Sequence, residues 1–281
     1  MTEQEKEEKG CKISLAGDLG SGKSTVSALL VEQLGAIGYS TGDRVREIAK
    51  ARGMSVCELN AYMETHPEID REIDDGLVRL SDDPRPMIID SRLAWHFTRG
   101  TFKVYMSVDP QISASRILKA GRATERFCSA EEAVAGIRER RKSETMRYRT
   151  QYGIDITDFF NYDLILDASY ATPEEVAFAL REAFRIWKED RDFRAVMVSP
   201  KRLLYPDDPP DAEQIAAYMD KLAAGEDVPP VEVFEHEGDL YLASGLESAL
   251  ASAMMSARFI QATLVKASPA GKTYVRMADS L

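Results

Sequence analysis

A run of glycines and small hydroxyl residues near the start of the chain has the composition of a phosphate-binding loop. The segment GDLGSGKS has the spacing Gly-x-x-x-x-Gly-Lys-Ser, from Gly17 to Ser24. In this pattern the backbone N–H groups turn inward around a phosphate, Lys23 reaches the outer phosphates and the Ser24 hydroxyl ligates Mg²⁺. The residues predicted to hold a nucleoside triphosphate are Gly17, Asp18, Gly20, Ser21, Gly22, Lys23, Ser24 and Thr25.

The sequence around this loop supports the same interpretation. Residues 12–16 are a short, strand-like run, and residues 25–30 are apolar and helix-forming. A phosphate loop needs this order of strand, loop and helix, because the start of the helix adds its positive end to the site. A glycine turn that binds no ligand is the alternative, and the flanking segments make it the weaker one.

Four arginines form the second chemical feature. An enzyme that transfers a phosphoryl group between two anions supplies mainly positioning and positive charge. Arg140 and Arg147 are two helical turns apart and are expected on one face of a helix. Arg46 follows the second predicted strand and Arg92 the third, where the ligand cleft of a parallel sheet lies. Singly, each would be an ordinary surface arginine; together they predict a second phosphate site.

Three further charged residues belong to this prediction. Arg122 and Arg126 lie in a glycine-containing stretch that is expected to form a mobile loop over the site. Asp90 ends the buried strand Met87-Ile88-Ile89-Asp90, where it is expected to face the cleft. A turn or helix cap is the alternative role for this carboxylate.

The composition is that of a globular protein, with 44% hydrophobic and 30% charged residues among 281. The net charge of -11 disfavours non-specific binding to nucleic acid or to anionic membranes. Three cysteines without CxxC spacing predict reduced thiols in a cytoplasmic protein, with neither disulfides nor zinc. Residues 1–10 are charged and are expected to form a disordered tail without a signal peptide. No run approaches the length of a membrane span.

Strands and helices are predicted to alternate over residues 11–190. Capping signals precede three of the helices, at Ser55, Ser129 and Thr172, each followed three residues later by glutamate. Alternation of this kind predicts an α/β fold with a doubly wound parallel sheet. The expected strands are residues 12–16, 38–42, 87–90, 102–108 and 162–167.

The last third of the chain has a different character. The charged run 188–194 is predicted to be a linker, and residues 195–281 a small α+β domain in which acidic residues outnumber basic ones by roughly two to one. The expected strands are 195–198, 231–234, 240–243 and 259–265, and the expected helices 211–224 and 245–257.

The first 190 residues resemble the cytidylate kinases, in particular the shorter archaeal-type form among the nucleoside monophosphate kinases. The resemblance rests on six segments in the same order and spacing. They are GDLGSGKS from Gly17, STG from Ser40 with Arg46 after it, DSRL from Asp90, RxxSExxRY from Arg140, YGID from Tyr152 and YDLILD from Tyr162.

This resemblance implies ATP and Mg²⁺ as cofactors and assigns roles to named residues. Lys23, Arg122, Arg126 and Arg140 would be catalytic, with the two loop arginines neutralising the donor phosphates. Ser24 and Asp90 would serve the metal. The acceptor site would consist of Thr41, Arg46, Asp90, Arg92, Arg140 and Arg147. The family usually has glycine where this chain has Ser91, and a side chain there could crowd the acceptor.

Residues 195–281 more faintly resemble the ParB and sulfiredoxin-like fold. The phosphate-binding turn of that family corresponds here to Ala243-Ser244-Gly245-Leu246-Glu247-Ser248, which lacks the family's histidine and arginine. Glu247 would repel a phosphate. The resemblance therefore implies a degenerate domain with a regulatory, docking or self-association role.

Two hypotheses of different class follow. The first is ATP-dependent phosphoryl transfer to a nucleoside monophosphate, CMP or dCMP above others. The second is a catalytically weak, nucleotide-responsive binding protein whose acidic C-terminal part holds a protein partner. A kinase of another small acceptor is a narrower third possibility.

Overall fold

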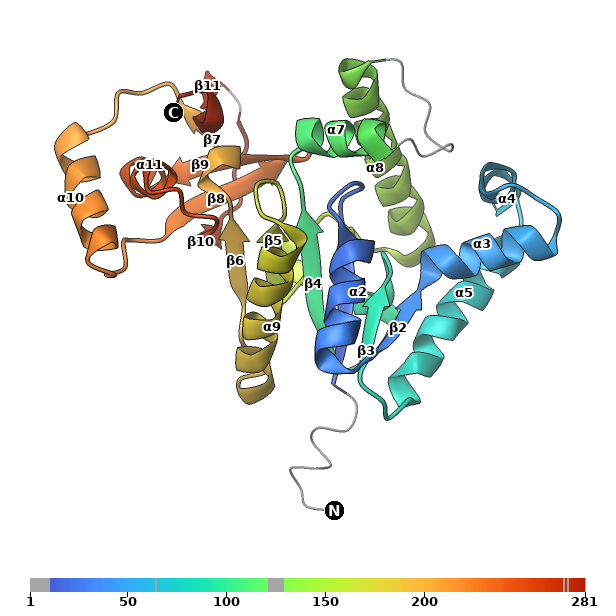
Figure 1. Ribbon diagram of the computed structural model, residues 1–281. Helices are drawn as coiled ribbons and strands as arrows, with labels where there is room; N and C mark the ends of the chain where they lie inside the picture. Colours follow the sequence, from blue (N-terminus) through green and yellow to red (C-terminus); the bar gives the residue numbers. More distant parts are fainter. Residues whose placement is uncertain (1–10, 64, 121–128, 270, 272, 281) are drawn as a thin grey trace.

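The computed structural model describes residues 11–63, 65–120, 129–269, 271 and 273–280, and Figure 1 gives its course. The predicted tail at residues 1–10 and the loop arginines Arg122 and Arg126 lie outside the described residues. No helix in the described part of the chain is long and apolar enough to cross a membrane.

The N-terminal two thirds form a parallel sheet with helices on both faces. Its five strands have the order β2-β3-β1-β4-β5, and every neighbouring pair is parallel. This confirms the predicted α/β class. The elements are β1 (Lys12–Gly17), α2 (Lys23–Leu34), β2 (Ile37–Ser40), α3 (Thr41–Ala51), α4 (Val56–Met63), α5 (Pro67–Arg79), β3 (Met87–Asp90), α6 (Ala94–Phe97), β4 (Thr101–Ser107), α7 (Pro110–Ala120), α8 (Ala130–Tyr152), β5 (Leu164–Asp167) and α9 (Pro173–Glu189).

The predicted caps begin the helices as expected. Thr172 and Glu175 form both bonds of a capping box at the start of α9, and Ser55 and Glu58 do the same before α4. One boundary differs from the prediction, since the strand expected over residues 38–42 ends at Ser40 and α3 begins at Thr41. Ser40 caps α3, accepting a hydrogen bond from the Asp43 N–H at 3.2 Å.

The sheet does not end with β5. Strand β6 pairs with β5 in parallel, and the full order is β11-β7-β9-β8-β10-β6-β5-β4-β1-β3-β2. The predicted boundary between the N-terminal domain and the C-terminal domain, at residues 190–195, therefore falls inside one continuous sheet. The remaining elements are β6 (Ala195–Val198), β7 (Leu204–Pro206), α10 (Ala212–Ala223), β8 (Val231–His236), β9 (Asp239–Ser244), α11 (Leu246–Met254), β10 (Ile260–Leu264) and β11 (Tyr274–Arg276). The three-residue strands β7 and β11 were not predicted.

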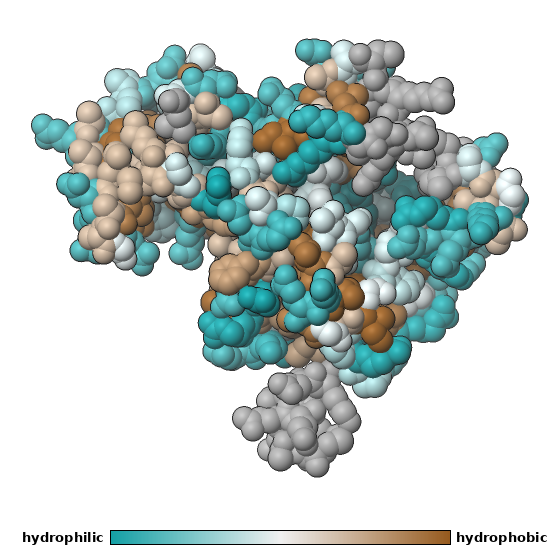
Figure 2. All heavy atoms as spheres, in the orientation of Figure 1, coloured by the Kyte–Doolittle hydropathy of each residue, from teal (hydrophilic) through white to brown (hydrophobic). Residues whose placement is uncertain are grey.

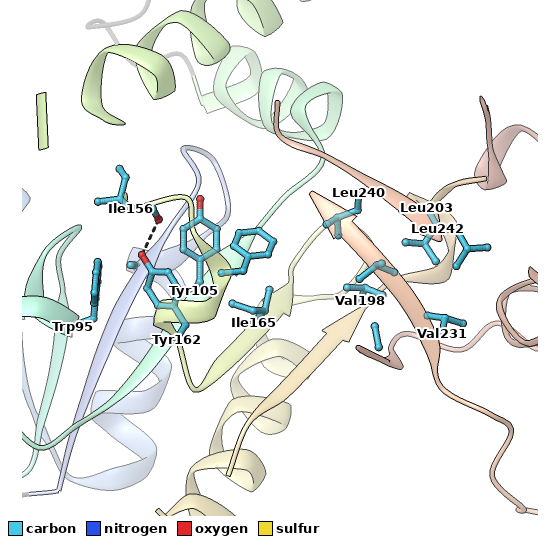
Figure 3. Close-up of a cluster of buried hydrophobic side chains, with 14 of the residues drawn as sticks. Trp95, Tyr105, Ile156, Tyr162, Ile165, Val198, Leu203, Val231, Leu240 and Leu242 are labelled. Atoms are coloured by element: carbon cyan, nitrogen blue, oxygen red, sulfur yellow. Dashed lines mark hydrogen bonds between the residues drawn. The ribbon is translucent and has the colours of Figure 1, made fainter. Parts of the chain in front are cut away.

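A single hydrophobic core also runs across this division. One cluster of buried side chains includes Tyr105 and Ile165 from the parallel strands together with Val198, Val231 and Leu240 from the C-terminal segment. Figure 3 shows these two groups packed next to each other along the sheet. On the opposite face, α2 and α9 cover a second cluster. Burial of apolar surface, the dominant favourable term in folding, thus joins the two segments.

The exposed surface follows the helix sequences. In Figure 2 the face over α3 and α5 is mainly hydrophilic, as expected for helices rich in aspartate, glutamate and arginine. The surface over α10 is paler brown, consistent with the alanines in AEQIAAYMDKLA.

A buried ion pair ties the C-terminal segment to the end of β5. Arg202 and Asp167 are 1% and 0% exposed, and Arg202 Nη1 donates to Asp167 Oδ1 at 2.9 Å. The same guanidinium donates to the Ser107 hydroxyl and to the Gly238 carbonyl, each at 2.8 Å. A charge that has been removed from water needs such partners. Asp167, at the carboxyl end of β5, therefore depends on an arginine from beyond residue 194.

We expect Arg202→Leu to lower the free energy of unfolding by about 3–5 kcal/mol, because it leaves the Asp167 carboxylate buried without its cation. Urea denaturation of the full chain measures this. Arg185→Leu is the control, since Arg185 is 57% exposed and, within the described part of the chain, pairs with Glu182 and Glu189 on its own helix. Its expected cost is below about 1 kcal/mol. Equal losses in the two variants would contradict the prediction.

Candidate active site

The loop between β1 and α2 has a backbone that favours glycine, and Gly17 and Gly22 show this at its two ends. Gly17 has φ +142°, and a Cβ there would lie 2.1 Å from the Met106 carbonyl oxygen. Gly22 has φ +86° and immediately precedes α2. Positive φ values of this kind strain any other residue. The predicted spacing of the loop thus corresponds to a real turn at the carboxyl end of β1.

Lys23 points back into this loop. Its Nζ donates to the carbonyls of Gly17 at 2.9 Å and Asp18 at 2.7 Å, and to the Ser21 hydroxyl at 3.3 Å. Burial and, after it, the positive charge of Arg92 lower the pKa of Lys23 to about 8. The amine is thus held inside the loop by three oxygen acceptors, with a pKa of about 8.

A cleft of about 350 Å³ opens beside the loop. It brings together residues from the phosphate loop, from the start of α3, from the end of β3 and from α8. The residues that line it are Leu19, Gly20, Gly22, Lys23, Ser24, Thr25, Ser40, Thr41, Gly42, Val45, Arg46, Asp90, Ser91, Arg92, Arg140 and Glu144.

Ser24 and Asp90, the two residues predicted to serve the metal, meet in this cleft. The Ser24 hydroxyl donates to Asp90 Oδ2 at 3.1 Å. Both side chains offer the hard oxygen ligands that Mg²⁺ prefers, and a magnesium site of this kind takes only one or two protein ligands beside water and phosphate. The pair therefore fits the metal that the resemblance implies. No group of three or more acidic, histidine or cysteine side chains forms a metal site among the described residues.

Three of the four predicted acceptor arginines line the cleft. Arg92 donates through Nη1 to the Gly17 carbonyl, and its Nε lies 2.9 Å from Glu144 Oε2. Arg140 Nε donates to the other oxygen of Glu144 at 3.1 Å. Arg46 is more exposed, at 63%, and pairs with Asp43 one turn back on α3. The hydroxyl of Thr41, the first residue of α3, donates to the Asp90 carbonyl at 3.4 Å.

Arg147 is placed differently from the other three. Its Nη2 donates to the Tyr148 hydroxyl at 3.0 Å, and its guanidinium lies 4.9 Å from the centre of that ring. It is not among the residues that line the cleft. Helical periodicity correctly gives Arg140 and Arg147 a common neighbour, Glu144, whose charge acts on both. The periodicity does not tell how far along the helix the cleft extends.

Ser91, which stands where the cytidylate kinases usually have glycine, has a local structural role. Its side chain is 4% exposed, and its hydroxyl accepts a hydrogen bond from the Leu93 N–H at 3.2 Å. The side chain therefore stabilises the turn after β3, and its polar atom is engaged with the backbone.

Sequence reasoning missed Glu144 as a site residue. Burial alone would raise the pKa of this carboxyl group, but Arg92 and Arg140 outweigh burial and hold the pKa below its usual value. The negative charge of Glu144 keeps two guanidinium groups side by side. Its position four residues after Arg140 was a usable signal, since side chains at that spacing meet on a helix.

Arg116 was also missed. It lies on α7 and donates to the Gly20 carbonyl at 3.3 Å and to the carbonyls of Ala168 and Ser169 at 2.7 and 3.1 Å. It thereby joins the phosphate loop to the segment after β5. No sequence pattern marks such a contact between distant loops.

Several known proteins are similar to this chain. A family model described as an AAA domain matches residues 13–147. The cytidylate kinase of Pyrococcus abyssi is 38% identical over 177 residues, which cover 62% of this chain and 94% of the relative. That of Natronomonas pharaonis is 35% identical over 182 residues, covering 64% of this chain and 92% of the relative. A solved shikimate kinase from Bacteroides thetaiotaomicron, 17% identical, superposes with a TM-score of 0.45 over 62% of this chain and 98% of its own.

The two archaeal kinases match almost over their whole length, while more than a third of this chain lies outside each alignment. The phosphate loop and the cleft arginines up to Arg140 fall within the matched family model. On this extent of identity the chain belongs to the cytidylate kinase family.

Proposed function

We propose that the chain transfers the γ-phosphoryl group of ATP to a nucleoside monophosphate, with CMP or dCMP as the preferred acceptor and Mg²⁺ as the metal. The single observation that carries the proposal is the convergence of Arg46, Arg92 and Arg140 on the cleft opposite the phosphate loop. The phosphate loop by itself would suffice for a protein that only binds ATP. Three guanidinium groups facing it supply the charge that a second phosphate needs.

Each residue of the site would have a distinct role in phosphoryl transfer. Backbone N–H groups of the loop and Lys23 bind the donor phosphates, and Ser24 and Asp90 would hold Mg²⁺, which neutralises charge on them. Arg92 and Arg140 bind the acceptor phosphate and keep its oxygen in line with the γ-phosphorus. The acceptor is already an anion, so no protein side chain has to remove a proton from it. Catalysis then rests on positioning and on charge.

Arg122 and Arg126 are proposed to neutralise the donor phosphates, and Arg147 to bind the acceptor together with Thr41. These roles rest on the resemblance of the sequence segments. We also propose a cytoplasmic setting, since the reaction consumes ATP.

The C-terminal segment is proposed to be a ParB/sulfiredoxin-like domain over residues 195–281, next to a kinase domain over 11–190. Its order of strand, helix, hairpin, helix and strand supports the assignment. Glu247 accepts a hydrogen bond from the Asp211 N–H at 3.3 Å, which gives this acidic residue a structural role next to α10. We infer that the domain has no phosphate chemistry of its own and acts by regulation, docking or self-association.

The alternative function is a nucleotide-responsive binding protein with weak or no transfer activity, or a kinase of another small acceptor. The contacts of Lys23 with three loop oxygens are compatible with ATP binding alone. What favours transfer over mere binding is the pairing of Arg92 and Arg140 through Glu144, because a binding protein has no need of two cations at the acceptor side.

An ADP-release assay over a panel of nucleoside monophosphates tests the proposal. We expect turnover with CMP and dCMP that is lost on chelation of Mg²⁺. We expect Lys23→Ala to lower kcat by about 10²–10³-fold, as for the loss of one preorganised donor, with a melting temperature close to that of the wild type. Lys221→Ala, an exposed change on α10, is the control and should retain full activity. ATP binding without turnover on any acceptor would favour the binding-protein alternative.

The lowered pKa of Lys23 gives a pH dependence of ATP binding. The protonated amine binds the phosphates, so affinity is full below pH 8 and is lost as the pH rises through the pKa of the free protein. Between pH 7 and pH 9 the Kd for ATP should rise by about tenfold. Calorimetry at several pH values measures it.

Lys23→Arg is the control, because a guanidinium remains charged over this range. Its Kd is expected to change by less than twofold between pH 7 and pH 9, whatever its absolute value. The same pH dependence in the arginine variant would show that another group causes it.

A further inference from the structure

The turn of the β8–β9 hairpin reaches the phosphate-binding half of the chain. Glu237 and Gly238 form a two-residue turn with φ values of 51° and 93°, as in the turns that fit hairpin twist. A Cβ added to Gly238 would lie 2.9 Å from Arg141 Nη1 and 3.4 Å from Pro110, the first residue of α7. Figure 1 shows this end of the hairpin next to α7. The C-terminal segment thus contacts two elements beside the phosphate loop.

Two ion pairs hold α8 to this hairpin. Arg141 Nη1 donates to Glu235 Oε1 at 2.9 Å, and Arg138 Nη2 donates to Asp239 Oδ2 at 2.8 Å. Arg138 and Arg141 are three residues apart and therefore lie on one face of the helix. Arg141 and Glu235 are each 17% exposed, so this pair is screened by water much less than a surface pair.

Arg141 lies between two carboxylates. Besides Glu235, its Nε is 3.8 Å from Asp18 Oδ1 in the phosphate loop. Its buried Nε and Nη2 have no hydrogen-bond partner among the described residues. The hydrogen bond of the guanidinium thus goes to Glu235, while its interaction with Asp18 is only electrostatic.

Asp18 in turn fixes the loop. Its carboxylate accepts hydrogen bonds from the Tyr105 hydroxyl at 2.6 Å and from the Val108 N–H at 3.1 Å, which tie the loop to β4. Its backbone carbonyl accepts from Lys23 Nζ at 2.7 Å and from the Ser21 hydroxyl at 2.8 Å. The geometry of this one residue therefore sets both the shape of the loop and the position of the lysine.

We propose that Glu235, in the C-terminal segment, is a positioning residue for ATP binding: it holds Arg141 away from Asp18 and so leaves the Asp18 carboxylate to Tyr105 and Val108. Without Glu235, the nearest carboxylate to the buried guanidinium is Asp18. A direct pair between Arg141 and Asp18 competes with the bonds from β4 and displaces the loop. The inference rests on the proposed function in one respect, that the loop binds ATP.

Calorimetry on the full chain tests this with ATP and CMP as separate ligands. Glu235→Gln is expected to raise the Kd for ATP five- to twentyfold and to change the Kd for CMP by less than twofold, because the hydrogen bonds that Glu235 accepts among the described residues come from Arg141 and the Gly238 N–H and not from a cleft arginine. The matched control is Glu232→Gln on the same strand, whose exposed carboxylate accepts only from the Ser244 hydroxyl at 2.8 Å among the bonds of the described residues. It should bind both ligands as the wild type does.

Two results would overturn the proposal: an ATP Kd within twofold of the wild type, or equal weakening of ATP and CMP, which indicates general disruption. The route through Asp18 is tested in the Asp18→Asn background. There, Glu235→Gln is expected to add less than a twofold further loss of ATP affinity, and a full additional loss contradicts the route. If Glu235→Gln does not fold, Arg141→Lys is tested in its place. The expected result is again a five- to twentyfold rise in the Kd for ATP without a change for CMP. An unchanged ATP Kd, or equal weakening of ATP and CMP, would again overturn the proposal.

Failure of the proposed kinase activity is distinguishable from failure of this inference. If the wild-type chain binds ATP but phosphorylates no nucleoside monophosphate, the proposed acceptor is wrong. The Kd values of Glu235→Gln and Glu232→Gln for ATP still decide the role of Glu235. In that case the melting temperatures of the two variants replace the CMP measurement as the check for general disruption.

Discussion

A buried carboxylate at the end of a central strand has to find a cation inside the protein. Asp167 is fully buried at the carboxyl end of β5, and its cation is Arg202, from a segment that begins only after the sheet has passed from β5 to β6. The same arginine bonds to Ser107 at the end of β4. Since removal of one partner of a buried pair is far more costly than loss of a surface pair, the ends of β4 and β5 depend on the C-terminal segment for their charge balance.

The cleft obeys a second electrostatic constraint. The cleft gathers the cationic side chains of Lys23, Arg46, Arg92 and Arg140, and cations in one place repel each other. Glu144 relieves this repulsion, because it bonds to Arg92 and Arg140 through its two oxygens. Arg92 is held further by the Gly17 carbonyl. The guanidinium groups are thus preorganised by one carboxylate and one carbonyl, which is the condition for strong interaction with an incoming anion.

What the sequence could predict here depended on distance along the chain. The phosphate loop and the capping boxes at Ser55 and Thr172 are local, and the structure confirms them. Arg46 and Arg92 were recognisable because the ends of parallel strands meet at one edge. The pairs Arg202–Asp167 and Arg141–Glu235 link residues 35 and 94 positions apart. Nothing in the local pattern specifies such partners, and so neither the continuous sheet nor the role of Arg141 could be anticipated.

The position of β6 explains why a second segment can influence the first at all. A sheet that stopped at β5 would expose an edge of unpaired backbone groups, which proteins normally cover or blunt. Here β6 covers that edge, and the sheet then continues to the β8–β9 hairpin, which returns to α8. Arg141 lies between Glu235 on the hairpin and Asp18 in the phosphate loop. Under the proposed role of Glu235, a ligand or partner that moved the hairpin would change how Arg141 is shared between Glu235 and Asp18, and would so act on the phosphate loop from the C-terminal segment.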